Sequence, residues 1–498
     1  MNNLFLIGQC KCYNLFNNHA GHIVYPAQVK KEECILKPVE ISITERLIDY
    51  ALGCTHEQLT QKAVSVQRRC VGDTLACMLA AAGLDETGKN VARYAARMPG
   101  KCTMLAEDGG VCVESAALAN GALTHALDFD DSHDALVHPS SVTFPALLAL
   151  AEEMGSVSGR DFLTALVVGT DVSCRLAMGP NEDLMKYGWN SPPLMESMGA
   201  LFGAANLLRL THDELLDAIA MLMTQFTCSA EAMLSRGSVI RTMREGFAAQ
   251  AVVRSALMSR YGVRARFEMP LEGKYGFYAM YARGNYDPER IVQNLGARFE
   301  TENITFKPWP SCKHTHTSIQ ALEDVMTQEH LAADDIEEVH ISLYEASLMT
   351  LEPFESKCRP ESPSIAKSSM PFVLGTVMAR GGVGLESFLP ERLGDAEIYE
   401  NAKKVSYEVN PALTKAQNQW IDMTVNTKKG TFFRHLETSV GGTGCPMSEE
   451  QTRAKFFSCC RLYHDGASDA AIEELYCAAE HLDELENACR LLDIIRKI

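Results

Sequence analysis

The chain has 498 residues, of which 46% are hydrophobic and 22% charged, and its formal net charge at pH 7 is −18. This length predicts two domains, or one large domain with a smaller inserted one. The acidic balance argues against nucleic acid as a partner, because phosphate binding needs clustered lysine and arginine side chains. An anionic ligand would have to be bound by Arg, Lys or His side chains that converge locally in a pocket.

Cysteine spacing and hydropathy favour a reduced, cytoplasmic protein. The 17 cysteines are scattered and form no C-x-x-C pair, as expected for thiols in a core. No apolar run reaches the ~18–20 residues that a membrane span needs, so we expect no membrane association. Residues 1–40 have neither the Lys/Arg-led start of a secretory signal nor the arginines of a mitochondrial one, and we expect a loosely held extension there.

Helical signals dominate residues 41–302. Capping boxes, in which a Ser or Thr and a Glu or Gln three residues later bond each other's backbone amides, occur at Ser42, Thr55 and Thr211. Segments such as GDTLACMLAAAG and FLTALVVGTDVSCRLAMG are apolar on several faces, which suits helices buried among helices. We predict an all-helical domain for this part of the chain.

The pattern changes near residue 303. Residues 336–346 and 420–437 alternate apolar and polar side chains, which is typical of half-buried strands, and the second run contains a turn. A further capping box at Ser448 begins C-terminal helices. The predicted fold is mainly α, with a large all-helical domain (41–302 and 441–498) and an inserted smaller α+β lid domain (303–440).

The stretch LDFDDSHDALVHPSS, residues 127–141, contains four aspartates and two histidines between apolar segments. A metal site is one interpretation, but no histidine pair lies on a clear helix, and an aspartate site would leave the histidines unused. A carboxylate beside a histidine in a cleft suits acid/base chemistry, with Ser132 binding a substrate carboxylate. A helix-breaking loop, capped by Asp and Pro, explains the same residues. Taken alone, the stretch leaves these last two interpretations open.

Two further stretches carry ligand-type side chains. KPWPSCKHTHTSIQAL places Cys312, Lys313 and His316 before a predicted helix, whose N-terminal end attracts anions. A zinc site there would have only two or three ligands, and a polar linker at a domain junction is the simpler interpretation. In RGSVIRTMREGFAAQAVV, Arg241 and Arg244 share a predicted helix face. They suit either bidentate carboxylate binding or extension from a surface helix into solvent.

Together these stretches resemble the MmgE/PrpD family, which includes 2-methylcitrate dehydratase, cis-aconitate decarboxylase and iminodisuccinate epimerase. The resemblance covers the chain from about residue 41 onward and rests on GDTLACMLAAAG, ALDFDDSHDALVHPSSVTFPALLALAE, GTDVSCRLAMG, MREGFAAQAVVRSAL, LEGKYGFYAMY, KPWPSCKHTH and PMSEEQTRAKF. It implies a helical domain with an α+β lid, catalysis without a metal or organic cofactor, and a homodimer.

The family's site carries over in part. Asp128, Ser132 and His138 match the acidic, hydroxyl and histidine positions of its D-F-D-D-[ST] motif. Arg241 stands where decarboxylase-like members have a substrate-contacting lysine, which keeps the charge but loses the option of a neutral amine. Asn190, in YGWNSPP, stands where the fungal decarboxylase has a histidine.

The KPWPSCKHTH stretch carries over with one ambiguous position. Cys312 lies where members have either histidine or cysteine, and His316 fits a histidine that several members have. The resemblance therefore implies a catalytic set of Asp128, His138 and His316, and a substrate-binding set of Ser132, Asn190, Arg241, Cys312 and Lys313.

The implied activity is that of a cofactor-independent lyase on a small di- or tricarboxylate, first of all a 2-methylcitrate-dehydratase-like elimination of water. His138 would transfer one proton, Asp128 would orient it or act as the partner acid, and His316 would arrive with the lid. Arg241 and Lys313 would hold the carboxylates. The alternatives are cis-aconitate decarboxylation, epimerisation of the iminodisuccinate type, and, in another class, a non-catalytic carboxylate-binding protein.

Overall fold

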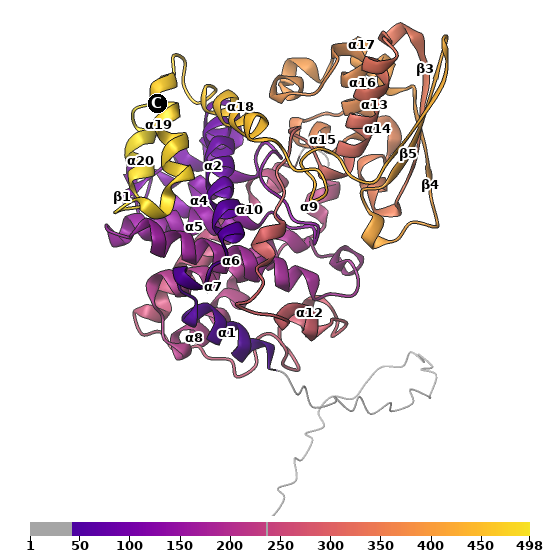
Figure 1. Ribbon diagram of the computed structural model, residues 1–498. Coiled ribbons are helices and arrows are strands. Elements are labelled where there is room, and N and C mark those ends of the chain that lie inside the picture. The colour runs from indigo at the N-terminus through magenta and orange to yellow at the C-terminus, as the bar shows by residue number, and fades with distance from the viewer. Residues whose placement is uncertain (1–41, 236–237) are drawn as a thin grey trace, which may run out of the picture. The chain divides into compact units, whose positions relative to one another are not determined.

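Most of the chain before residue 300 is helical (Figure 1). The computed structural model describes residues 42–235 and 238–498, so the predicted extension at residues 1–40 lies outside the described residues. The helices here are α1 (Ile43–Gly53), α2 (Gln61–Leu84), α3 (Glu86–Ala95), α4 (Val113–Thr124), α5 (Pro139–Met154), α6 (Gly159–Met178), α7 (Ser191–Leu208), α8 (His212–Gln225), α9 (Glu231–Leu234), α10 (Ile240–Arg260), α11 (Phe277–Tyr281) and α12 (Pro288–Val292). A small unpredicted sheet pairs β1 (Pro99–Thr103) with β2 (Gly110–Val111).

Side-chain caps fix where several of these helices begin. Ser42, Thr60 and Ser158 accept hydrogen bonds from first-turn amides of α1, α2 and α6. The predicted capping box at Thr211 is confirmed at the start of α8. The box at Thr55 opens only a short 3-10 turn, because the chain turns again at Thr60 before α2 begins.

Two glycines allow α10 to pass very close to α4. A Cβ added at Gly121 of α4 would lie 2.8 Å from the Cα of Gly246 on α10, and one added at Gly246 would lie 2.4 Å from the Leu118 carbonyl oxygen. The two backbones therefore meet without intervening side chains. This close crossing places the first turn of α10, which carries Arg241, beside the loop that follows α4.

The predicted α+β part follows. Its elements are α13 (His316–Gln328), β3 (Ile336–Leu343), α14 (Phe354–Cys358), α15 (Pro363–Lys367), α16 (Met370–Arg380), α17 (Ala396–Ala402), β4 (Val405–Val409), β5 (Ile421–Thr427) and β6 (Gly430–Leu436). The sheet order is β4-β3-β5-β6, with β3 parallel to β4 and antiparallel to β5. The strands predicted from alternation are confirmed as β3, β5 and β6. Sequence reasoning missed β4, because Val405 is its one buried residue and no alternation results.

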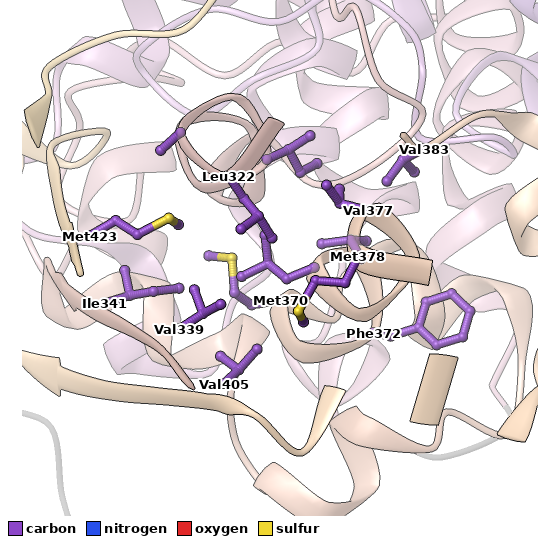
Figure 2. Packing of buried hydrophobic residues seen from close by; sticks show 14 of the residues in the cluster. Leu322, Val339, Ile341, Met370, Phe372, Val377, Met378, Val383, Val405 and Met423 are labelled. Carbon is purple, nitrogen blue, oxygen red and sulfur yellow. The ribbon is translucent and has the colours of Figure 1, made fainter. Parts of the chain in front are cut away.

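One face of this sheet packs against helices to form a separate apolar core. Val339 and Ile341 of β3 and Met423 of β5 belong to the same buried cluster as Leu322 of α13 and Met370 of α16. Figure 2 shows these side chains pointing toward one another between the strands and the helices. The buried members of this core lie within residues 319–425, and the partly buried side chains packed against it lie within 309–436, so the α+β part carries its own hydrophobic stabilisation.

The chain ends in three helices, α18 (Glu449–Cys460), α19 (Asp469–Glu480) and α20 (Arg490–Ile495). The capping box predicted at Ser448 is confirmed at the start of α18. Both α18 and α19 pack against α2, as the yellow helices in Figure 1 show. Residues 42–498 form one compact unit, so the lid boundaries at 303 and 440 remain predictions.

We predict that Gly246→Ala destabilises the protein by about 1–3 kcal/mol, because the new methyl group meets backbone atoms of α4 that cannot rotate away. Gly53→Ala is the matched control, since a Cβ at Gly53 meets nothing within 4 Å. That control should be neutral or slightly stabilising, as alanine favours the helix. Thermal and denaturant unfolding of both variants measure the effect, and equal stabilities would contradict a tight crossing.

Candidate active site

The loop between α4 and α5 supplies most of the predicted chemistry. It begins after Thr124 and ends at His138, where Pro139 starts α5. Asp128 has a left-handed backbone (φ 52°), a conformation that a side chain disfavours and that commonly marks functional sites. Ser132 forms an isolated backbone bridge with Thr305, which attaches the loop to the segment leading into the α+β part.

Three buried lysines from distant segments hold carbonyl groups of this loop. These lysines are at most 6% exposed, and their ammonium groups donate to successive parts of the loop. The contacts are Lys367 to the Ala126 carbonyl at 2.9 Å, Lys307 to the Asp128 carbonyl at 3.1 Å, and Lys455 to the Phe129 carbonyl at 2.6 Å. Charge-assisted hydrogen bonds therefore help to fix a loop that contains isolated backbone bridges but no helix or strand.

The carboxylate of Asp128 lies between two cations. Arg241 Nη2 donates to one oxygen at 2.7 Å, and Lys307 Nζ donates to the other at 2.5 Å. Burial alone would raise the pKa of the Asp128 carboxyl, but Lys307 and Arg241 outweigh burial and hold that pKa well below its usual range. Burial would likewise lower the pKa of Lys307, but Asp128 and Asp130 raise it. Both partners are charged at neutral pH.

A second carboxylate, Asp130, binds two histidines. His125 Nδ1 lies 3.0 Å from its Oδ1, His138 Nδ1 lies 3.3 Å from its Oδ2, and Ser141 Oγ donates to the same Oδ2 at 2.5 Å. The two imidazole rings are 4.4 Å apart between centroids. Burial alone would raise the pKa of Asp130, but His125, His138 and Lys307 outweigh burial and keep that pKa below its usual range.

His138 is a neutral base whose tautomer is fixed by its contacts. Its Nδ1 lies 2.8 Å from the Asp131 carbonyl oxygen, which can only accept, so Nδ1 carries the hydrogen. Burial, reinforced by Lys307 and His125, lowers the pKa of His138 well below its ordinary value despite Asp130. The Nε2 lone pair is therefore the proton acceptor that His138 offers to the cavity it lines.

His125, Asp130 and His138 are also close enough together to be considered as metal ligands. Both Nδ1 atoms already contact oxygen acceptors, and Lys307 Nζ lies 3.8 Å from Asp130 Oδ1. A divalent cation would displace these hydrogen bonds and lie beside an ammonium group. The group therefore fits a hydrogen-bonded acid/base cluster better than a metal site.

A cavity of about 130 Å³ opens beside these groups. Most predicted site residues line it, namely Asp128, Ser132, His138, Asn190, Arg241, Cys312 and Lys313. Lys313 donates to Asp134 at 2.7 Å and to Thr305 at 3.1 Å. Burial raises the pKa of Cys312, which favours the protonated thiol.

His316, predicted to be catalytic, does not line this cavity in the structure. Its Nε2 lies 3.0 Å from the Ser311 carbonyl oxygen, and its ring meets Trp309 edge-on. Burial lowers the pKa of His316 to about 3, so it is neutral. His314, two residues earlier in a 3-10 turn, lines the cavity instead. A catalytic role for His316 through lid closure stays a prediction.

Sequence reasoning missed two residues at the centre of the site, Lys307 and His125. Lys307 is the first residue of the KPWP stretch. Its side chain is only 2% exposed, but a lysine before two prolines gives no sequence pattern that predicts burial. His125 is a single polar ring in the apolar segment GALTHAL, three residues before Asp128. That isolated histidine, so close to the aspartates, was the available signal.

Comparison with known proteins identifies the family. Residues 45–289 match the MmgE/PrpD N-terminal domain, and residues 309–479 match the MmgE/PrpD C-terminal domain. The chain belongs to the MmgE/PrpD family. The two matched domains meet between residues 289 and 309, near the predicted start of the α+β part.

Curated relatives in the MmgE/PrpD family are similar over most of the chain. A cis-aconitate decarboxylase of Aspergillus terreus is 24% identical over 488 residues, which cover 91% of this chain and 96% of the relative. The Homo sapiens cis-aconitate decarboxylase is 26% identical over 397 residues, covering 77% and 79%, and that of Mus musculus is 25% identical over 401 residues, covering 76% and 78%. The chain is a lyase of this family.

The remaining sequence predictions concern membrane spans, the cellular compartment and nucleic acid. Within residues 42–235 and 238–498, no helix combines the length and apolarity required to cross a bilayer. Cytoplasmic localisation and the exclusion of nucleic acid stay predictions.

We predict that Asp131→Asn stabilises the protein at pH 8. Burial raises the pKa of Asp131 from 3.8 to about 7, and its Oδ2 has no hydrogen-bond partner among the described residues. Between these values the unfolded chain loses the proton and the folded protein keeps it, so wild-type stability falls as the pH rises. At roughly 1.4 kcal/mol per pKa unit, the substitution should gain a few kcal/mol at pH 8 and little at pH 4.

Denaturant unfolding at both pH values measures this gain. Asp134→Asn is the control, because the Asp134 side chain is 52% exposed and Lys313 contributes to lowering its pKa. It should give no gain at pH 8. A gain from Asp131→Asn that is the same at pH 4 and pH 8 would contradict the assigned titration.

Proposed function

We propose that this lyase removes carbon dioxide from a small unsaturated tricarboxylate, with cis-aconitate as the first substrate to test. The observation that carries the proposal is the cavity in which Arg241 and Lys313 lie beside the neutral imidazole of His138. Relatives that bear the name cis-aconitate decarboxylase, similar over most of the chain, support the same reaction.

The cations of the cavity suit the binding of carboxylates. Arg241 uses Nη2 for Asp128, and its other donors have no hydrogen bond to described residues. Lys313 uses two of its three protons for Asp134 and Thr305, which leaves one. A polycarboxylate therefore finds an ammonium and a guanidinium group on the cavity wall, despite the acidic net charge of the protein.

The proposed chemistry needs one proton. The bond between a carboxylate carbon and its methylene carbon breaks, carbon dioxide leaves, and the electron pair shifts across the neighbouring double bond. A proton then adds to the far carbon. His138 delivers this proton from Nε2, because the negative charges of a bound tricarboxylate oppose the effect of burial on the pKa of His138 and favour its imidazolium form. Water then restores the proton.

Elimination of water from a 2-methylcitrate-like acid is the second candidate. The neutral base at His138 favours it, because elimination starts with removal of a proton next to a carboxylate. Asn190 and Arg241, which depart from the decarboxylase-like residues noted in the sequence, are consistent with a reaction that differs from that of the relatives.

The test is turnover of cis-aconitate, 2-methylcitrate and iminodisuccinate in deuterated water, followed by NMR with and without a chelator. We expect carbon dioxide loss from cis-aconitate, with deuterium on the carbon that receives the proton, and no effect of the chelator. His138→Asn should lower kcat at least ~100-fold.

The control is His340→Asn, which changes a half-buried histidine on β3 that contacts Ser406. It should leave kcat unchanged. Thermal stabilisation by these acids without any turnover would overturn the proposal in favour of a non-catalytic carboxylate-binding protein. Loss of activity with the chelator would contradict metal-independent chemistry.

We also propose that the protein is a homodimer. Large apolar side chains are exposed on α10 and the segment after it, including Phe247, Tyr261 and Tyr275. Light scattering should give twice the chain mass of 54.8 kDa, and Phe247→Asp should shift the mass toward one chain. Phe433→Asp, at an exposed position on β6, is the control and should stay dimeric. A wild-type mass of one chain would contradict the proposal.

A further inference from the structure

His125 is a buried histidine, and one of its two ring nitrogens has no hydrogen-bond partner among the described residues. Its side chain is 1% exposed, and it lines the same cavity as His138. Nδ1 lies 3.0 and 3.1 Å from the two oxygens of Asp130, whereas Nε2 is buried and has no hydrogen-bond partner among the described residues. A buried polar atom without a hydrogen-bond partner costs about 1–3 kcal/mol of folding stability. Stability alone therefore does not explain a histidine at position 125.

The contacts of His125 fix which nitrogen faces the ligand. Asp130 is an ionised carboxylate and can only accept, so the Nδ1 of His125 carries a hydrogen and donates it. Asp130 also accepts from Ser141 and lies beside His138 Nδ1, so it orients both rings at once. Each imidazole is thereby held by Nδ1, which leaves Nε2 of each ring for a molecule in the cavity.

We propose that His125 is a second catalytic histidine, whose Nε2–H donates a hydrogen bond to the substrate oxygen on which negative charge develops. Asp130 is the positioning residue that orients His125 and His138 together. The inference rests on the proposed function, because it assigns His125 a role in the same carbon dioxide loss.

The role follows from where the charge goes in that reaction. When the carbon–carbon bond breaks, its electron pair is delocalised onto a remaining carboxylate before the proton adds to carbon. The carboxylate of Asp130 holds the His125 ring through Nδ1 and leaves Nε2 for a substrate oxygen in the cavity. The Nε2–H of His125 then stabilises the growing charge on oxygen, while His138 delivers the proton to carbon. No bond to His125 forms or breaks.

Two substitutions separate this role from a merely structural one. In His125→Asn the amide nitrogen can occupy the place of Nδ1 and keep the contact with Asp130, but nothing replaces Nε2. In His125→Gln the longer side chain can place an amide donor near Nε2, but it loses the contact with Asp130. If His125 donates to the substrate through Nε2, the Gln variant is the more active of the two. If His125 is only structural, the Asn variant is the more active.

We expect His125→Asn to lower kcat on cis-aconitate ~100-fold to ~1,000-fold with KM within ~3-fold, which is the effect of losing one transition-state donor. His125→Gln should recover at least ~10-fold of that loss. His340→Asn serves again as the histidine control and should match wild type. A kcat for His125→Asn within ~3-fold of wild type, or an Asn variant more active than the Gln variant, would overturn the inference.

A binding measurement keeps the inference testable if wild type turns over none of the acids. The Nε2 resonance of His125 in protein labelled with ¹⁵N-histidine is assigned by its absence from His125→Asn. Addition of propane-1,2,3-tricarboxylate, which has no double bond to react, should shift it. An unmoved resonance at saturating ligand overturns the role of His125, whereas a shifted resonance without turnover refutes only the proposed decarboxylation.

Discussion

The site depends on one buried carboxylate, Asp128, held between the guanidinium of Arg241 and the ammonium of Lys307. None of these three charges is stable alone in a protein interior, because burial penalises each ionised form. Together they compensate one another and join the loop after α4, the start of α10 and the segment before α13. The same arrangement supports a left-handed backbone at Asp128 that would otherwise be unfavourable.

Around that charge cluster the protein separates two tasks between two aspartates. Asp128 is bound by permanent cations, so it keeps its charge and holds Arg241 at the cavity. Asp130 contacts the Nδ1 atoms of two histidines, and this orients both rings toward the cavity that they line. Of the four aspartates in this stretch, Asp128 lines the cavity and Asp130 contacts the two histidines that line it.

Much of the fold and part of the site could be predicted from the sequence, because local patterns reflect local physics. Alternation predicted β3 and β5, whereas β4 has too few buried positions to leave a pattern. Most of the predicted site residues line the cavity. His314, in a short 3-10 turn, also lines it, whereas His316, at the start of α13, contacts the Ser311 carbonyl instead, and the sequence does not distinguish the two. The burial of Lys307 and the contact of His125 with Asp130 arise only when distant segments meet.

The lysine of α18 gives the site a dependence on the order of synthesis. Lys455 donates to the Phe129 carbonyl and lies 2.6 Å from Asp73 of α2, so the last region of the chain braces a loop made more than 300 residues earlier. A nascent chain that has already produced every residue lining the cavity still lacks this brace until α18 leaves the ribosome. This brace therefore requires synthesis of the chain through Lys455, and a product terminated before that residue would contain the cavity-lining residues without one of the contacts that fix their loop.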